Sequence, residues 1–142
     1  MRIGLVGCVK SKLAHAAPAR DLYVSALFRG RRCYVERSTD RWFILSAKHG
    51  LVDPDQVLEL YNETLNDKPR AARRSWSQQV LRAIEQKLGE VSGVEFEVEA
   101  GAAYLAHGLE EGLLARRATV VNPTKGMPLG RQLQFYKHAS CL

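Results

Sequence analysis

Residues 42–55 have the sequence WFILSAKHGLVDPD, and the rest of the chain can be interpreted from this stretch outward. Its first four residues form an uninterrupted apolar run, which is typical of a strand buried on both faces. The run then gives way to small, ionisable and turn-forming residues. Open α/β sheets bind ligands beyond the carboxyl ends of their strands, so this transition predicts a ligand site. The alternative is a strand followed by a solvated turn.

Apolar runs of strand length alternate along the chain with segments of helical spacing. The alternation predicts a single α/β domain over residues 1–142, with a doubly wound, mainly parallel four-stranded sheet and helices on both faces. Residues 94–100 alternate apolar residues with glutamate, which predicts a strand with one face in water. We expect Gly30 to bend or break the first helix, and residues 50–67 to form a long loop. The expected strands are 2–7, 42–45, 94–100 and 118–121, and the expected helices begin near Pro18, Pro69, Gly101 and residue 128.

Composition restricts the class of protein. The net charge of +6 favours an anionic partner such as a nucleotide or nucleic acid. No apolar run approaches the roughly 20 residues of a membrane span, and the amino-terminal segment lacks the features of a signal peptide, so we expect a cytoplasmic protein. The three cysteines and four histidines are widely scattered, which predicts neither a disulfide framework nor a metal site.

The carboxyl ends of parallel strands meet at one edge of a sheet, so residues that follow the strands are expected to lie together. Gly101 would allow a close backbone approach to a ligand. The residues predicted at this edge are Cys8, Lys10, Ser11, Lys12, Ser46, Lys48, His49, Gly101, Tyr104, Asn122 and Lys125.

These side chains suggest acid–base and nucleophilic chemistry. His49 and Lys48 are candidates for proton transfer or leaving-group stabilisation, and the slightly favoured alternative for His49 is a loop histidine bonded to the backbone. Cys8 is a candidate nucleophile, or else a small residue that closes the core. Asp53, or another acidic residue up to Glu63, could activate a water molecule.

Binding roles follow from the same arrangement. Lys10, Ser11 and Lys12 could bind a phosphate or a base, although residues 7–12 form neither a Walker A loop nor a dinucleotide fingerprint. Tyr61 and Tyr104 could stack on a base, and Tyr61 could equally anchor its loop to the core. Asn122 could present its amide to a nucleobase edge.

Several motifs together resemble a family of short prokaryotic and phage proteins of unknown function, some of which are encoded beside relatives of tRNA-guanine transglycosylase. The family is distantly similar to the peroxide-stress protein YaaA and to a uracil-DNA-glycosylase-like domain of archaeosine synthase. The chain departs from the pattern at Gly7, where serine is common, and in residues 122–129. The motifs are GCVKSK (7–12), DLYVSALF (21–28), FILSAKHGL (43–51), YNETL (61–65), Trp76, AGAAY (100–104) and GRQL (130–133).

The resemblance implies a uracil-DNA-glycosylase-like or Rossmann-like sheet and a link to nucleobase or nucleic-acid chemistry, but it implies no particular reaction. We therefore expect an enzyme that acts on a nucleobase, nucleoside or nucleotide, most concretely by hydrolysis or transfer at an N-glycosidic bond, without a cofactor. The alternatives are a non-catalytic, basic nucleic-acid- or nucleotide-binding module and a structural protein. The sequence does not predict an oligomeric state.

Overall fold

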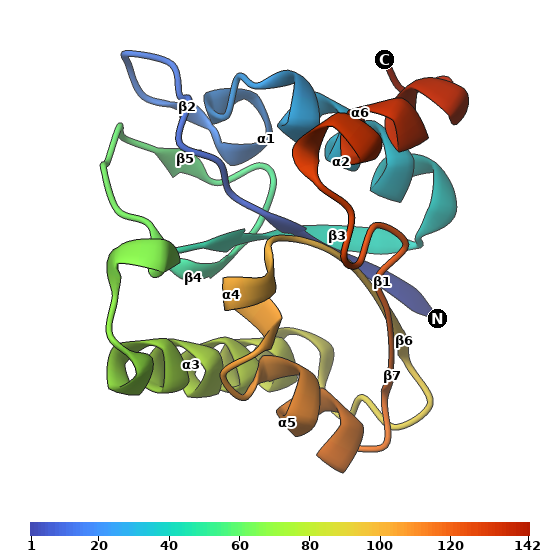
Figure 1. Cartoon of the computed structure of the whole chain (residues 1–142). Coiled ribbons are helices and arrows are strands. Elements are labelled where there is room, and N and C mark those ends of the chain that lie inside the picture. Colours follow the sequence, from blue (N-terminus) through green and yellow to red (C-terminus); the bar gives the residue numbers. More distant parts are fainter.

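A computed structural model describes residues 1–142 and contains a five-stranded sheet in the order β4-β3-β1-β6-β7 (Figure 1). Four strands are mutually parallel, and β4 pairs antiparallel with β3 at the edge. The prediction of an α/β fold with a mainly parallel sheet is confirmed, while the predicted number of four strands is wrong. The five strands are β1 (Arg2–Gly7), β3 (Arg41–Ser46), β4 (Gly50–Val52), β6 (Glu95–Glu99) and β7 (Thr119–Val121).

The additional strand lies in the segment that the sequence predicts as a loop. Gly50 adopts a positive φ of 73°, which lets the chain reverse after β3 and pair Ser46 with Gly50. The same segment contains β5 (Val57–Leu58), which pairs with β2 (Ala17–Pro18), and a 3₁₀ turn, η1 (Leu65–Asp67). Strands of two or three residues are too short to display an alternating pattern, so the sequence could not reveal them.

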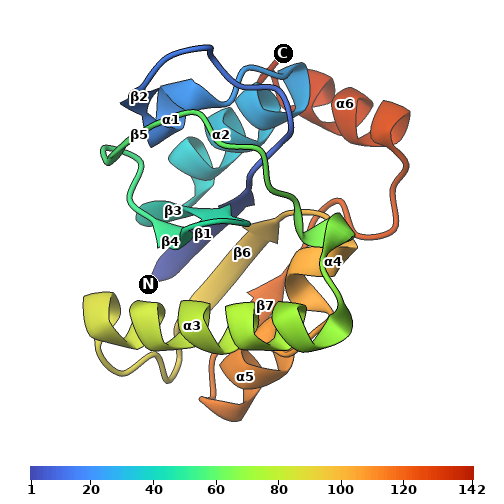
Figure 2. The ribbon, with the colours of Figure 1, turned by 90° about the vertical axis from the view of Figure 1, so that its left-hand side faces the viewer.

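Helices cover both faces of the sheet (Figures 1 and 2). One layer contains α1 (Ala19–Leu22), α2 (Ala26–Ser38) and α6 (Leu129–His138), and the other contains α3 (Arg70–Leu88), α4 (Ala102–Leu105) and α5 (Leu109–Ala115). As predicted, α3 begins next to Pro69 and ends at Leu88, with Gly89 as its C-cap. None of the helices combines the length and apolar character that crossing a membrane would require.

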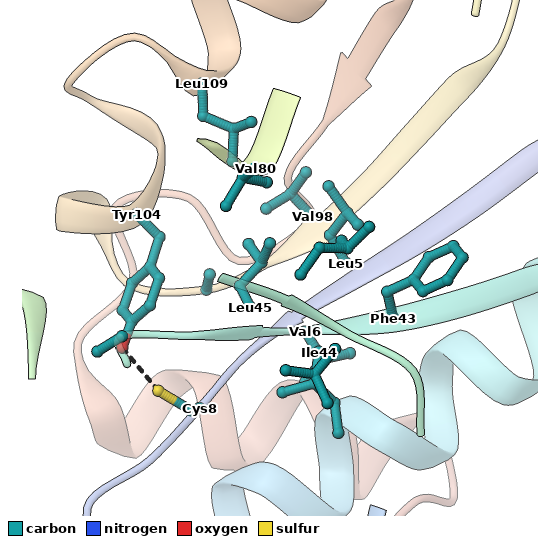
Figure 3. Close-up of a cluster of buried hydrophobic side chains, with 14 of the residues drawn as sticks. Leu5, Val6, Cys8, Phe43, Ile44, Leu45, Val80, Val98, Tyr104 and Leu109 are labelled. Carbon is teal, nitrogen blue, oxygen red and sulfur yellow. Dashed lines mark hydrogen bonds between the residues drawn. The ribbon is translucent and has the colours of Figure 1, made fainter. Parts of the chain in front are cut away.

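The core is one cluster of 32 buried residues. Figure 3 shows Leu5, Phe43 and Val98, from three neighbouring strands, on the side of the sheet where Val80 of α3 and Leu109 of α5 also lie. The apolar runs of the strands are therefore buried as expected.

The first predicted helix differs from the observed one. It is divided by residues 23–25, and Ser25 starts α2 by accepting a hydrogen bond from the Phe28 amide at 3.1 Å. Gly30 does not bend or break α2. A Cβ atom at this position would lie 2.8 Å from the Cβ of Tyr136, so the glycine instead permits close packing of α2 against α6.

The prediction of a solvated face on β6 is wrong. Glu97 and Glu99 are only 2% and 0% exposed, because α2 and α6 cover that side of the sheet. Glu97 accepts hydrogen bonds from Ser38 at 2.6 Å and Arg2 at 3.1 Å. An alternating pattern marks two different faces, and here the second face is buried and polar rather than wet.

The prediction against disulfides is also corrected. Cys33 in α2 is bonded to Cys141, which follows α6, with 5.6 Å between their Cα atoms. The two residues are 108 positions apart, so only the packing of α2 and α6 reveals the pair. Cys8 remains a free, buried thiol.

Candidate functional site

The order of the strands places a switch point between β1 and β6. After β1 the chain adds β3 on one side, and it then crosses to add β6 on the other. Ligands of open α/β sheets bind at such points, beyond the carboxyl ends. A cavity of about 560 Å³ lies there, which we call the first cavity. It is lined by Cys8, Val9, Lys10, Lys12, Leu27, Arg31, Asn62, Glu63, Thr64, Asn66, Asp67, Gly101 and Tyr104.

Cys8 and Tyr104 meet at this cavity. The Sγ atom of Cys8 lies 3.0 Å from the hydroxyl oxygen of Tyr104 (Figure 3), and the tyrosine ring packs edge-on against Trp76. Burial, with a contribution from Cys8, raises the pKa of Tyr104. The hydroxyl is therefore protonated at neutral pH and can donate a hydrogen bond.

The loop after β1 supplies two ammonium groups to the first cavity. Lys12 Nζ lies 4.6 Å from the ring centroid of Tyr61 and donates to the Lys10 carbonyl at 3.2 Å. Burial lowers the pKa of Lys12, against a raising influence of Cys8. Ser11, predicted beside them, does not line the cavity; its carbonyl accepts from the Val24 amide at 3.0 Å.

Arg31 is a cavity residue that the sequence analysis missed. Its side chain is only 5% exposed, and it reaches the carbonyl of Gly7 and the amide oxygen of Gln132 at 3.5 and 3.3 Å. The available signal was positional: Arg31 shares a helix face with the buried residues Phe28 and Val35. A charged residue on an apolar face is uncommon unless it has a partner or a function.

Residues 62–67 form the acidic side of the first cavity. In Figure 2 the green segment that contains them descends from the layer of α1 and α2 to the start of α3. Glu63 forms an ion pair with Lys68 at 3.0 Å, whereas no ion pair involves Asp67. Thr64 fixes the turn by accepting from the Asn66 amide at 3.3 Å. The sequence offers Glu63 as one of several candidate carboxylates, and no local pattern distinguishes Asp67.

Ser46 and Tyr61 lie beneath the site rather than in it. Tyr61 is 6% exposed, and its hydroxyl group bonds Ser46 Oγ at 2.8 Å and the hydroxyl of Tyr23. Ser46 also accepts from Trp76 Nε1 through its carbonyl at 2.8 Å. Burial raises the pKa of Tyr23 to about 12. Of the two roles considered for Tyr61, the structure supports the anchoring of its loop.

Lys48 and His49 follow β3 at the predicted edge but do not line the first cavity. The His49 amide donates to Ser46 Oγ at 3.0 Å, and its ring packs edge-on against Tyr61. Burial, followed by the charge of Lys48, lowers the pKa of His49. The imidazole is therefore neutral at pH 7.

Asp53 lies where the parallel strands begin, opposite the edge formed by their carboxyl ends. Because β4 runs antiparallel to β3, its end approaches the start of β3. Asp53 lies there within 3.7 Å of Arg41 and 3.8 Å of Lys87. The predicted association of Asp53 with Cys8 and Lys48 is not found.

A second cavity of about 620 Å³ adjoins the carboxyl ends of β6 and β7. Asn122 and Lys125 line it, and Gly101 lines both cavities. The Asn122 Oδ1 atom is buried without a hydrogen-bond partner. The predicted edge thus exists as two neighbouring sites rather than one. No three histidine, cysteine or acidic side chains come together in a way that could hold a metal ion.

Comparison with known proteins gives relatives without an assigned activity. A 63-residue segment is 33% identical to the uncharacterised protein YfjM of Bacillus subtilis (strain 168). The segment covers 40% of this chain and 42% of YfjM, which is less than half of either protein. No solved structure matches the chain. The model of a family of unknown function, DUF6884, matches residues 3–138, and the chain belongs to that family.

Proposed function

We propose that the protein is an enzyme that acts on a nucleobase, nucleoside or nucleotide, free or within nucleic acid, by hydrolysis or transfer at an N-glycosidic bond. The observation that carries the proposal is the first cavity, where carboxylates face cations. Glu63 and Asp67 line one part, and Lys10, Lys12 and Arg31 line another. Its volume of about 560 Å³ falls within the range of small-ligand sites.

These groups match the demands of glycosidic cleavage. The transition state resembles an oxocarbenium ion, which a nearby carboxylate stabilises. In hydrolysis, water adds to the anomeric carbon as the bond to the base nitrogen breaks, and that nitrogen keeps the electron pair. Asp67 or Glu63 would accept the proton of the water, and Lys12 or Tyr104 would donate a hydrogen bond to the departing base. In transfer, another nucleophile takes the place of water.

We also propose that the sheet is related to those of uracil-DNA glycosylases and of YaaA. The parallel order β3-β1-β6-β7 and the cavity beyond the carboxyl ends support this relationship. The segments FILSAKHGL and AGAAY, which carry the sequence resemblance, surround the carboxyl ends of β3 and β6.

The test measures base release by chromatography and mass spectrometry, using a panel of nucleosides, nucleoside 5′-monophosphates and short oligonucleotides. The purified protein is expected to release the base from at least one class. The double variant Glu63→Gln/Asp67→Asn should reduce turnover by 10²-fold or more, in the range of lost acid–base catalysis. Asp53→Asn, at the opposite edge, is the matched control and should retain turnover. Absence of release across the panel, or full activity of the double variant, overturns the proposal.

The second candidate is a non-catalytic nucleotide- or nucleic-acid-binding module, which the net charge of +6 and the three cavity cations favour. It predicts binding without turnover, and affinity for nucleic acid that falls steeply with salt. The same panel distinguishes the two candidates, because a binding module retains every substrate intact.

A further inference from the structure

The guanidinium group of Arg31 is a buried charge within a cavity. The residue is 5% exposed and lines the first cavity beside the loop that follows β1. Arginine stays protonated in proteins and carries five N–H donors. Removing such a group from water is unfavourable unless an opposite charge and further hydrogen bonds replace the lost hydration.

The protein itself satisfies Arg31 incompletely. The contacts of its two Nη atoms are 3.5 Å to a carbonyl and 3.3 Å to an amide oxygen, whereas charge-assisted bonds are usually about 2.7–2.9 Å. The Nε atom is buried and has no partner. The guanidinium group of a residue that lines the cavity is therefore not fully hydrogen-bonded by the protein.

No carboxylate forms an ion pair with Arg31. None of the ion pairs of the protein includes Arg31. The nearby carboxyl group of Glu99 is bonded to Tyr136 rather than to Arg31, and burial raises its pKa to about 8. Glu63, on the far segment of the cavity, is paired with Lys68.

We propose that the first cavity binds a phosphate group of its ligand against Arg31, with Lys10 and Lys12 as the other cationic contacts. A guanidinium fork suits two phosphate oxygens, and ammonium groups add charge without fixed geometry. The inference deepens the proposed function and rests on it only for the nucleoside part of the ligand: the substrate is phosphorylated, as a mononucleotide or as part of a nucleic acid.

The first experiment measures thermal unfolding and calorimetric binding with inorganic phosphate, then with nucleoside 5′-monophosphates and the matching nucleosides. Phosphate should raise the Tm of the wild-type protein in a concentration-dependent manner, since it binds the folded state. Monophosphates should bind at least tenfold more tightly than nucleosides. If phosphate does not change the Tm, or if nucleosides bind as tightly as monophosphates, the proposal is wrong.

The decisive variant is Arg31→Met, which keeps an apolar stem of similar length and removes the charge. It should fold without phosphate at least as stably as the wild-type protein, because an unpaired buried charge has been removed. Its phosphate-induced Tm shift should vanish. Should Arg31→Met fail to fold, the exposed Lys10→Gln variant provides the same test and should weaken phosphate binding at least threefold. Undiminished binding by the folded variant contradicts the proposal.

Arg29→Gln is the matched control, because Arg29 lies on α2 outside the cavity and its side chain donates a hydrogen bond to the carbonyl of Val24 at 3.2 Å. It should bind phosphate as the wild-type protein does. If Arg29→Gln loses as much phosphate binding as Arg31→Met, the effect of charge is nonspecific and the proposed site is refuted.

Oligonucleotides without terminal phosphates distinguish the source of the phosphate group. If they bind the wild-type protein but not Arg31→Met, the site holds an internal phosphodiester. If only mononucleotides bind, the site holds a terminal phosphate. Phosphate binding without base release would support this site and refute the proposed reaction. Base release without phosphate binding would support the proposed reaction and refute this site.

Discussion

The hydroxyl group of Tyr136 donates a 2.8 Å hydrogen bond to Oε1 of Glu99, which connects the last helix to the carboxyl end of β6. Both residues are fully buried. The second carboxyl oxygen of Glu99 has no partner. Burial is the main reason that the pKa of Glu99 is raised from 4.5 to about 8, and this shift makes the stability of the fold depend on pH.

Glu99→Gln should remove that pH dependence. The folded protein holds a proton on Glu99 that the unfolded chain has released, so this contribution is complete below about pH 4.5 and is lost as pH rises through about 8. The slope cannot exceed about 1.4 kcal/mol per pH unit for one proton. Urea unfolding between pH 5.5 and 8.5 should show that the free energy of unfolding of the variant rises relative to that of the wild-type protein as pH rises. A constant difference across this range would refute the prediction.

Glu97→Gln is the control on the same face of β6. It removes a carboxylate that accepts hydrogen bonds from Arg2 and Ser38. We expect it to lower the free energy of unfolding rather than raise it at pH 8.5, because it replaces charge-assisted bonds.

Reduction of the Cys33–Cys141 bond should destabilise the protein strongly. The bond closes a loop between residues 108 positions apart, for which the chain-entropy model gives about 4–5 kcal/mol. Dithiothreitol should therefore lower the Tm of the wild-type protein and of Cys8→Ala, but not that of Cys33→Ala. An unchanged wild-type Tm after confirmed reduction of the bond would contradict the expectation.

Tyr61→Phe should reduce stability without abolishing ligand binding. The change removes a hydroxyl group that bonds both Ser46 and Tyr23, and leaving buried polar groups unpaired costs about 1–3 kcal/mol each. Chemical denaturation and ligand titration on the same sample separate the two effects. Tyr34→Phe is the control because no hydrogen bond of its hydroxyl group is present, and it should stay within about 0.5 kcal/mol of wild type. A Tyr61→Phe protein of full stability with lost binding would instead assign Tyr61 to the ligand.

Gly30→Ala should destabilise the contact between α2 and α6. The new Cβ atom would lie 2.8 Å from the Cβ of Tyr136, and Tyr136 is fixed by its bond to Glu99. Overpacking of this kind costs about 1–3 kcal/mol. Gly130→Ala on α6 is the matched control, since nothing lies within 4 Å of its new Cβ atom. Thermal unfolding should show a lowered Tm only for Gly30→Ala. If both variants have the same Tm, the steric explanation is wrong.

The sequence by itself determined the elements whose pattern is local and long. The four-residue spacing of Trp76, Val80 and Ile84 predicts α3, and apolar runs together with the alternating pattern of residues 94–100 predict the four parallel strands. The rule that parallel strands end at one edge predicts that Cys8, Gly101 and Tyr104 lie together, and all three line the first cavity.

Tertiary structure alone decided which groups share an environment. Whether Glu99 meets water, whether Cys33 meets Cys141 and whether Arg31 reaches Gln132 all depend on α6 packing over α2. The antiparallel direction of β4, which carries Asp53 to the far edge, depends on a pairing of three residues. Local periodicity shows which residues share a face, whereas contacts between distant segments decide what covers that face. For this reason the edge of the sheet was predictable and the charge pattern of its cavity was not.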